Sequence, residues 1–172
     1  MINEYGTTQP EHAETPSNDD VISTINGLIQ TCKDGQEGFQ ESAEAVQNSQ
    51  IKSLFYELGQ QRAQFTGELQ GLVRELGGDP ENSGSFSGAI HRGWINLKSA
   101  VTGQDDGAIL NEAERGEDVA KNAYKNALET NLPANIAATI QTQYSAVQAA
   151  HDKVRDLRDA VNNAASSTAT GS

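Results

Sequence analysis

Residues 21–46, VISTINGLIQTCKDGQEGFQESAEAV, decide the fold of this chain. Apolar and small side chains recur there at alternating spacings of four and three residues, which is typical of an amphipathic helix that packs along a partner. The stripe comprises Val21, Ile25, Leu28, Cys32, Gly35, Phe39, Ser42 and Val46. Gly35 and Gly38 would each weaken an isolated helix by about 1 kcal/mol relative to alanine. We therefore expect a close helix crossing at these glycines, with a helix break as the alternative.

Similar stripes continue along the chain and predict four long helices and one short helix. The long helices are expected over 19–47, 49–76, 106–131 and 133–163, and the short one over about 85–102. Gly77 and Gly78, followed by Pro80, end the second long helix, and Pro133 suits the first turn of the last one. The inward face of 106–131 is mostly alanine and glycine. We expect this face to receive either a neighbouring helix or another subunit at close range.

This pattern predicts an all-α fold, namely a ferritin-like four-helix bundle with a long crossover that carries the extra short helix between the second and third long helices. Short links force neighbouring helices to be antiparallel, whereas one long connection permits a crossover, as in ferritin-like bundles. We expect a disordered acidic arm over 1–18, the bundle over 19–163 and a flexible tail over 164–172.

Composition and charge narrow the classes of function. The chain of 172 residues has a formal net charge of −12, which argues against nucleic acids and anionic membranes as partners, since both attract surplus lysine and arginine. A single cysteine argues against an intramolecular disulfide or a multi-cysteine zinc site. No apolar run approaches the ~20 residues that cross a membrane, and the first residues do not resemble a signal peptide. We therefore expect a soluble, cytoplasmic protein.

The predicted architecture raises the question of a dinuclear metal centre. Such a centre takes a Glu from each of two helices and a Glu-x-x-His motif from each of the other two. The sequence contains no Glu-x-x-His, so an iron-oxidising centre is not expected. A weaker candidate metal site remains at Glu114, Glu117 and His151. Glu114 and Glu117 lie three residues apart, and antiparallel packing of the last two helices would bring Glu117 and His151 to similar depth. In the alternative, Glu117 pairs with Lys121 one turn away and His151 hydrogen-bonds a neighbour such as Tyr124.

Two other residues on the stripes are polar or reactive types. Arg62 interrupts the stripe of the second helix, and a buried arginine is costly unless it is paired. We expect it to pair with a carboxylate on a facing helix, with Glu41 and Glu44 as candidates; in the alternative it belongs to a polar pocket. These two carboxylates and Glu68 are also reserve metal ligands. Cys32 is expected to be a small buried side chain rather than a reactive thiol. No motif for a catalytic nucleophile or a bound cofactor is recognisable, so we expect no catalytic residue.

The segment HRGWINLK, residues 91–98, joins basic and aromatic side chains in an acidic chain. His91, Arg92 and Trp94 are candidates for a partner surface, because tryptophan and arginine are enriched at interfaces. In the alternative, Trp94 fills the flank of the bundle while the basic side chains stay in water.

Five stretches between about 20 and 160 carry a family resemblance. They are TCKDGQEGFQESAEAV, LFYELGQQRAQFTGELQGLVRELGG, GAIHRGWINLKSAVTGQDD, ILNEAERGEDVAKNAYKNALE and QAAHDKVRDLRD. With HRGWINLK and ERGED as its most specific parts, the chain resembles a bacterial ferritin-like four-helix-bundle family known only as a domain of unknown function. The resemblance implies a ferritin-like bundle and supplies no catalytic residues. The longer acidic arm at the start of this chain departs from the family pattern.

These observations favour a non-enzymatic, soluble bundle protein that forms a homo-oligomer and has a structural or stress-related role. The stress-related part rests on analogy between folds alone. The alternative is a metal-binding ferritin-like protein that uses carboxylates and His151 in the bundle. A third interpretation is an adaptor that binds a protein partner through the surface around Trp94.

Overall fold

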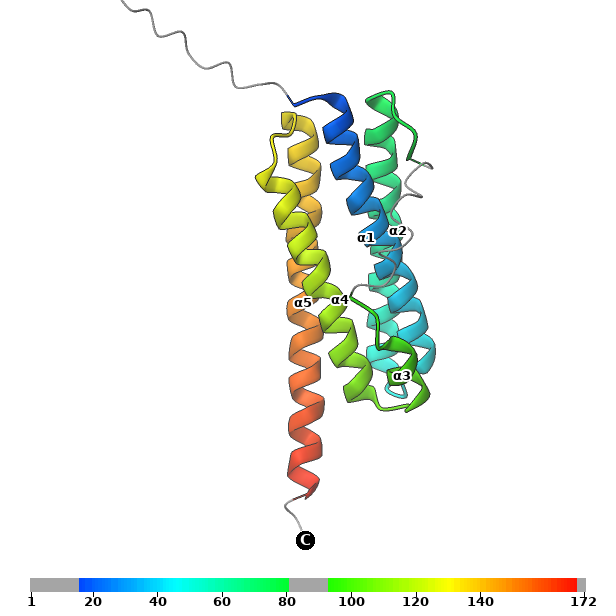
Figure 1. Cartoon of the computed structure of the whole chain (residues 1–172). Coiled ribbons are helices and arrows are strands. Elements are labelled where there is room, and N and C mark those ends of the chain that lie inside the picture. Colours follow the sequence, from blue (N-terminus) through cyan, green and yellow to red (C-terminus); the bar gives the residue numbers. More distant parts are fainter. Residues whose placement is uncertain (1–15, 81–92, 170–172) are drawn as a thin grey trace, which may run out of the picture.

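The computed structural model describes residues 16–80 and 93–169. Its five helices are α1 (Asn18–Ala45), α2 (Ser49–Glu75), α3 (Leu97–Thr102), α4 (Asp106–Glu129) and α5 (Ala134–Ala169). The described residues contain no strand, which confirms the predicted all-α class. Helix α1 packs along α2, α4 packs along α5, and the two pairs meet mainly through α1 and α4 (Figure 1). Helices α2 and α4 run in the same direction (Figure 1), as the predicted crossover between them requires.

Local capping explains where the long helices begin and end. The Ser17 hydroxyl, the Asn48 amide and the Asp105 carboxylate each accept a hydrogen bond from a backbone N–H in the first turn of α1, α2 and α4, as good N-caps do. Gly77 takes a positive φ of 79° just after α2. A left-handed residue at this position satisfies the last carbonyls of the helix, as predicted from the Gly77-Gly78 pair.

Several boundaries differ from those expected. The short helix expected over 85–102 is helical only over Leu97–Thr102, after turns at 93–96, while residues 81–92 lie outside the described ranges. Helix α5 begins one residue late, at Ala134, and continues to Ala169 instead of ending at 163. Residues 164–169 therefore extend the helix where a flexible tail was expected. The cause is the absence of any Gly or Pro between 134 and 169, because those are the residues that stop helices.

The first boundary also shifts by one residue. Helix α1 begins at Asn18, the last residue of the segment expected to be a disordered arm. Residues 1–15 of that segment lie outside the described ranges, so the structure describes only Pro16 and Ser17 before the helix. The bundle thus takes its first residue from the predicted arm because Ser17, rather than a residue further on, supplies the cap.

The interior holds two apolar clusters with a polar layer between them. One cluster contains Ile25, Cys32, Phe65 and Ala120, and the other contains Phe39, Leu58, Ala113 and Val154. Arg62 and Glu117 fall between these residues in the sequences of α2 and α4, so the polar layer crosses the bundle at mid-length. The alanine-rich face of α4 packs into these clusters. It therefore receives neighbouring helices and is not open to another subunit, which corrects one of the two expected uses of that face.

None of the helices in the described part of the chain has the length and apolar character needed to cross a lipid bilayer.

Candidate functional site

An ion pair occupies the centre of the bundle. Arg62 Nη2 donates to Glu117 Oε2 at 2.8 Å, and each of the two side chains is 1% exposed. The guanidinium also lies 5.6 Å from the centre of the Phe39 ring, within the range of a cation–π contact. Burial raises the pKa of Glu117, and the positive charge of Arg62 works in the opposite direction. The expected partners of Arg62, Glu41 and Glu44, are exposed on α1 instead, and Lys121 is not the partner of Glu117.

A chain of hydrogen bonds joins one residue from each long helix. Tyr124 Oη donates to Gln143 Oε1 at 2.7 Å, and Gln143 Nε2 donates to Glu68 Oε2 at 2.9 Å. The thiol of Cys32 lies 3.1 Å from Tyr124 Oη, and it donates because the tyrosine proton already goes to Gln143. Burial raises the pKa of Cys32 to about 11 despite this hydrogen bond. Cys32 is thus the buried, unreactive side chain that was predicted, and Glu68 has a structural hydrogen bond.

These central residues do not fit the dinuclear metal centre that a ferritin-like fold brings to mind. Two metal ions need several carboxylates and imidazoles that face one another. The middle of this bundle instead presents a guanidinium paired with a carboxylate, and a thiol, a phenol and an amide that bond to each other. A guanidinium at the centre would repel a cation.

A second polar group lies between α4 and α5, away from the bundle centre. It consists of Glu114, Asp118 and His151, whose ligand-type atoms all lie within 4.8 Å of one another. His151 Nε2 is 2.8 Å from Asp118 Oδ1 and 3.8 Å from Glu114 Oε1. The histidine is 6% exposed, whereas the Asp118 side chain is 57% exposed. The group therefore combines a buried nitrogen with carboxylates that reach water.

The structure brings together two of the three predicted metal candidates and replaces the third. Glu114 and His151 are close, because α4 packs along α5. Glu117 points into the bundle toward Arg62, and Asp118 takes its place. Sequence reasoning missed Asp118, although its spacing of four from Glu114 places both on one helix face. The expected hydrogen bond between His151 and Tyr124 is absent from the described contacts, because Tyr124 bonds to Cys32 and Gln143.

Trp94 packs into the flank of the bundle, as the second of its two interpretations held. Its side chain is 5% exposed, and its ring meets Phe39 edge-on with centroids 5.2 Å apart. A Cβ atom added at Gly38 or Gly116 would lie 2.4 Å or 2.3 Å from the indole, so both glycines make room for it. Trp94 is therefore not an exposed partner surface. His91 and Arg92, the other two candidates, lie outside the described residues.

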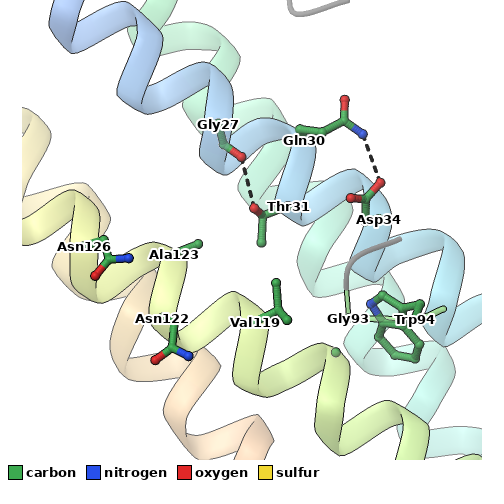
Figure 2. Close-up of a pocket in the computed structure, with 11 residues that line it drawn as sticks. Gly27, Gln30, Thr31, Asp34, Gly93, Trp94, Val119, Asn122, Ala123 and Asn126 are labelled. Carbon is green, nitrogen blue, oxygen red and sulfur yellow. Dashed lines mark hydrogen bonds between the residues drawn. The ribbon is translucent and has the colours of Figure 1, made fainter. Parts of the chain in front are cut away.

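A groove of about 430 Å³ runs beside Trp94 between α1 and α4 (Figure 2). Gln30 and Asp34 line it from α1, and Asn122 and Asn126 line it from α4. Gln30 Nε2 donates to Asp34 Oδ1 at 2.9 Å, so these two side chains satisfy each other along their own helix. Sequence reasoning did not predict this groove, because the groove depends on the distance between α1 and α4, which are far apart in sequence.

Comparisons with known proteins agree with this architecture. The family model described as "Domain of unknown function (DUF2383)" matches residues 20–130. A solved structure of a two-domain protein from Anabaena variabilis, with DJ-1/ThiJ/PfpI-like and ferritin-like domains, has a TM-score of 0.71 and 14% sequence identity. The match covers 88% of this chain and 39% of that one, so this chain spans about two fifths of that protein. The likeness shows that the fold is ferritin-like. No curated protein matches the sequence.

Proposed function

The chain belongs to the DUF2383 family, a domain of unknown function, and we propose that it is a non-enzymatic helical-bundle protein that self-associates in a structural or stress-related role. The observation that supports the proposal is the state of the bundle centre. Its polar side chains are used to bind one another across α1, α2, α4 and α5. An enzyme of ferritin-like fold would place reactive groups or metal ligands in the bundle centre. Here the polar side chains in the centre bind one another and so hold the helices together.

Self-association would use the outer surface of the bundle. The alanine-rich face of α4 is already buried, which leaves exposed apolar side chains as candidates. Ile95, just before α3, is 66% exposed, and exposed large apolar side chains favour protein contacts when partners can cover them. A cytoplasmic location is part of the same proposal. Its support is Cys32, a free, buried cysteine, since a fold without disulfides suits a reducing compartment.

Light scattering coupled to size-exclusion chromatography tests the self-association. We expect a mass of two or more chains at high protein concentration, and a shift toward the 18.3 kDa monomer on dilution. The variant Ile95→Ser should shift the equilibrium toward the monomer without changing the helix content seen by circular dichroism. A monomer at every concentration would contradict the proposal.

A further inference from the structure

We propose that Glu114, Asp118 and His151 form a site for a single divalent transition-metal ion at the boundary of α4 and α5. This inference goes beyond the proposed structural role and does not depend on self-association. It also differs from a dinuclear centre in place and in kind. The ion would lie outside the bundle centre, which the Arg62–Glu117 pair occupies, and it would be held by residues of two helices only.

The first observation is the state of the imidazole. His151 Nε2 is buried and forms no hydrogen bond with any described residue, although Asp118 Oδ1 is only 2.8 Å away. The separation is short enough for a hydrogen bond, but the carboxylate lies off the direction in which the ring nitrogen points. A buried nitrogen without a hydrogen bond is costly in a folded protein. An ion placed on the axis of Nε2 and bound also by the two carboxylates would satisfy it.

The second observation is the spacing of the three ligand atoms. Metal–ligand bonds of about 2.0–2.1 Å in tetrahedral geometry put neighbouring ligand atoms about 3.3 Å apart. His151 Nε2 is 2.8 Å from the Asp118 oxygen and 3.8 Å from the Glu114 oxygen, which brackets that spacing. Small changes in side-chain rotamers would therefore bring all three atoms to one ion. The exposure of Asp118 leaves the remaining coordination position open to water.

The third observation is the partner on the other ring nitrogen. His151 Nδ1 lies 3.4 Å from Asp152 Oδ1 in a hydrogen-bonding arrangement. The tautomer that carries its proton on Nδ1 donates to Asp152 and leaves the lone pair of Nε2 free. Metal-binding histidines are commonly oriented in this way, by a carboxylate that accepts from the nitrogen not bound to the metal.

The charge around the group also suits a cation. The ion pairs that extend from it along α5 contain more carboxylates than guanidiniums. The carboxylates are Glu114, Asp118, Asp152, Asp156 and Asp159, and the guanidiniums are Arg155 and Arg158. Arg158 pairs with Glu114 through Oε2, so Oε1, the oxygen that faces His151, stays available. The surplus of negative charge is what a divalent ion would neutralise.

The ligand set identifies the class of ion. One imidazole nitrogen and two carboxylate oxygens suit borderline divalent ions of the first transition row, with zinc as a strong member by the usual order of affinities. Magnesium and calcium prefer sites built from oxygen alone. The absence of sulfur from the set argues against Cu(I). The site should therefore bind Zn²⁺ and leave Mg²⁺ largely in solution.

Titration of the full, untagged chain with Zn²⁺ tests the site, by calorimetry and by competition with a chromophoric chelator. We expect one equivalent of Zn²⁺ per chain, unaffected by millimolar Mg²⁺. Asp118→Asn should weaken binding at least about tenfold, because loss of even an outer-shell partner has an effect of that size. His151→Gln should do the same. Both variants are checked for helix content, and the exposed position of Asp118 makes the first of them safe for folding.

Asp159→Asn is the matched control, because Asp159 is as exposed as Asp118 and lies in the same network of charges without facing His151. It should change the affinity less than threefold. Three results would overturn the proposal: no stoichiometric Zn²⁺ on the folded wild type, an unchanged affinity in Asp118→Asn, or equal losses in Asp118→Asn and Asp159→Asn. The last result would mean that acidic surface, rather than a site, attracts the ion.

Discussion

At the scale of single residues, the size of Trp94 determines what positions 38 and 116 can hold. The indole lies where a Cβ atom of either residue would be, at 2.4 Å from Gly38 and 2.3 Å from Gly116. The sequence drew attention to Gly38 because a glycine inside a helix is unfavourable, and it predicted a close approach there. It did not predict that a side chain from the connection before α3, rather than another helix, makes the approach, since a pattern of spacings contains no information about distant segments.

Alanine substitutions at Gly35 and Gly38 of α1 separate the effect of side-chain packing on stability from the effect of helix propensity. Both Gly38→Ala and Gly35→Ala gain about 1 kcal/mol of propensity. A Cβ at Gly35 meets Arg62 Cγ at an ordinary 3.5 Å, whereas one at Gly38 overlaps Trp94. We expect Gly38→Ala to lower the free energy of unfolding by about 1–3 kcal/mol, the usual cost of overpacking, and Gly35→Ala to preserve or raise it. Urea denaturation measures both, and a Gly38→Ala variant as stable as Gly35→Ala would contradict the packing of Trp94.

The raised pKa of the Cys32 thiol predicts that the folded protein loses stability at alkaline pH. Its pKa is raised from 9.0 to about 11 by burial, so between these pH values the unfolded chain releases a proton that the folded chain keeps. The unfolded state is thereby favoured, and the free energy of unfolding falls as pH rises from 9 to 11, by up to about 3 kcal/mol at 1.4 kcal/mol per pH unit. Below pH 9 the thiol is neutral in both states and contributes no slope.

Cys32→Ala removes this contribution while leaving the hydrogen bond from Tyr124 to Gln143. We expect the unfolding free energy of wild type to fall relative to that of Cys32→Ala as the pH rises from 8 to 10.5. Urea unfolding at both pH values measures the difference. Identical slopes for the two proteins would show that the thiol titrates alike in the folded and unfolded chains.

At the scale of helices, the stripes and caps were sufficient to predict the elements, while the partners of polar residues were not predictable. The apolar members of the α1 stripe are buried as expected, because amphipathic spacing depends only on the helix itself. The partner expected for Arg62 was on α1, its neighbour in sequence. The actual partner is on α4, whose backbone does not lie beside that of α2. Asp118 was missed for a related reason, since the antiparallel packing of α4 and α5 does not by itself tell whether Glu117 or Asp118 faces His151.

At the scale of the whole molecule, the Arg62–Glu117 pair links two helices that are diagonal in the bundle. The backbones of α2 and α4 do not lie side by side, so the two long side chains meet across the interior. The chain from Cys32 through Tyr124 to Gln143 joins helices that are neighbours. Together these bonds connect all four long helices, with the ion pair between the two apolar clusters and the Cys32–Tyr124 contact inside the first cluster. We expect them to fix how far each helix slides along the others, because apolar contacts alone specify this poorly.

Breaking the diagonal pair on one side should destabilise the whole bundle, whereas replacing both partners should not. Arg62 Nε and Glu117 Oε1 form no hydrogen bonds with described residues, so the buried charges are incompletely compensated. Glu117→Gln leaves a guanidinium without its counter-charge, and we expect a loss of about 3–5 kcal/mol in the free energy of unfolding. The double variant Arg62→Met with Glu117→Leu fills similar volume without charge, and should match or exceed wild type by up to about 4 kcal/mol.

The double variant should lose the fixed register of its helices. Without the polar pair, the two apolar clusters join into one, and no polar contact then sets how the helices align along their length. Urea unfolding gives the energies, and the near-ultraviolet circular dichroism of Trp94 and the tyrosines reports whether one packing persists. We expect the double variant to be stable but to show a weaker aromatic signal and a broader transition than wild type. If it loses as much stability as Glu117→Gln, the ion pair stabilises the fold in its own right and its role is not limited to alignment.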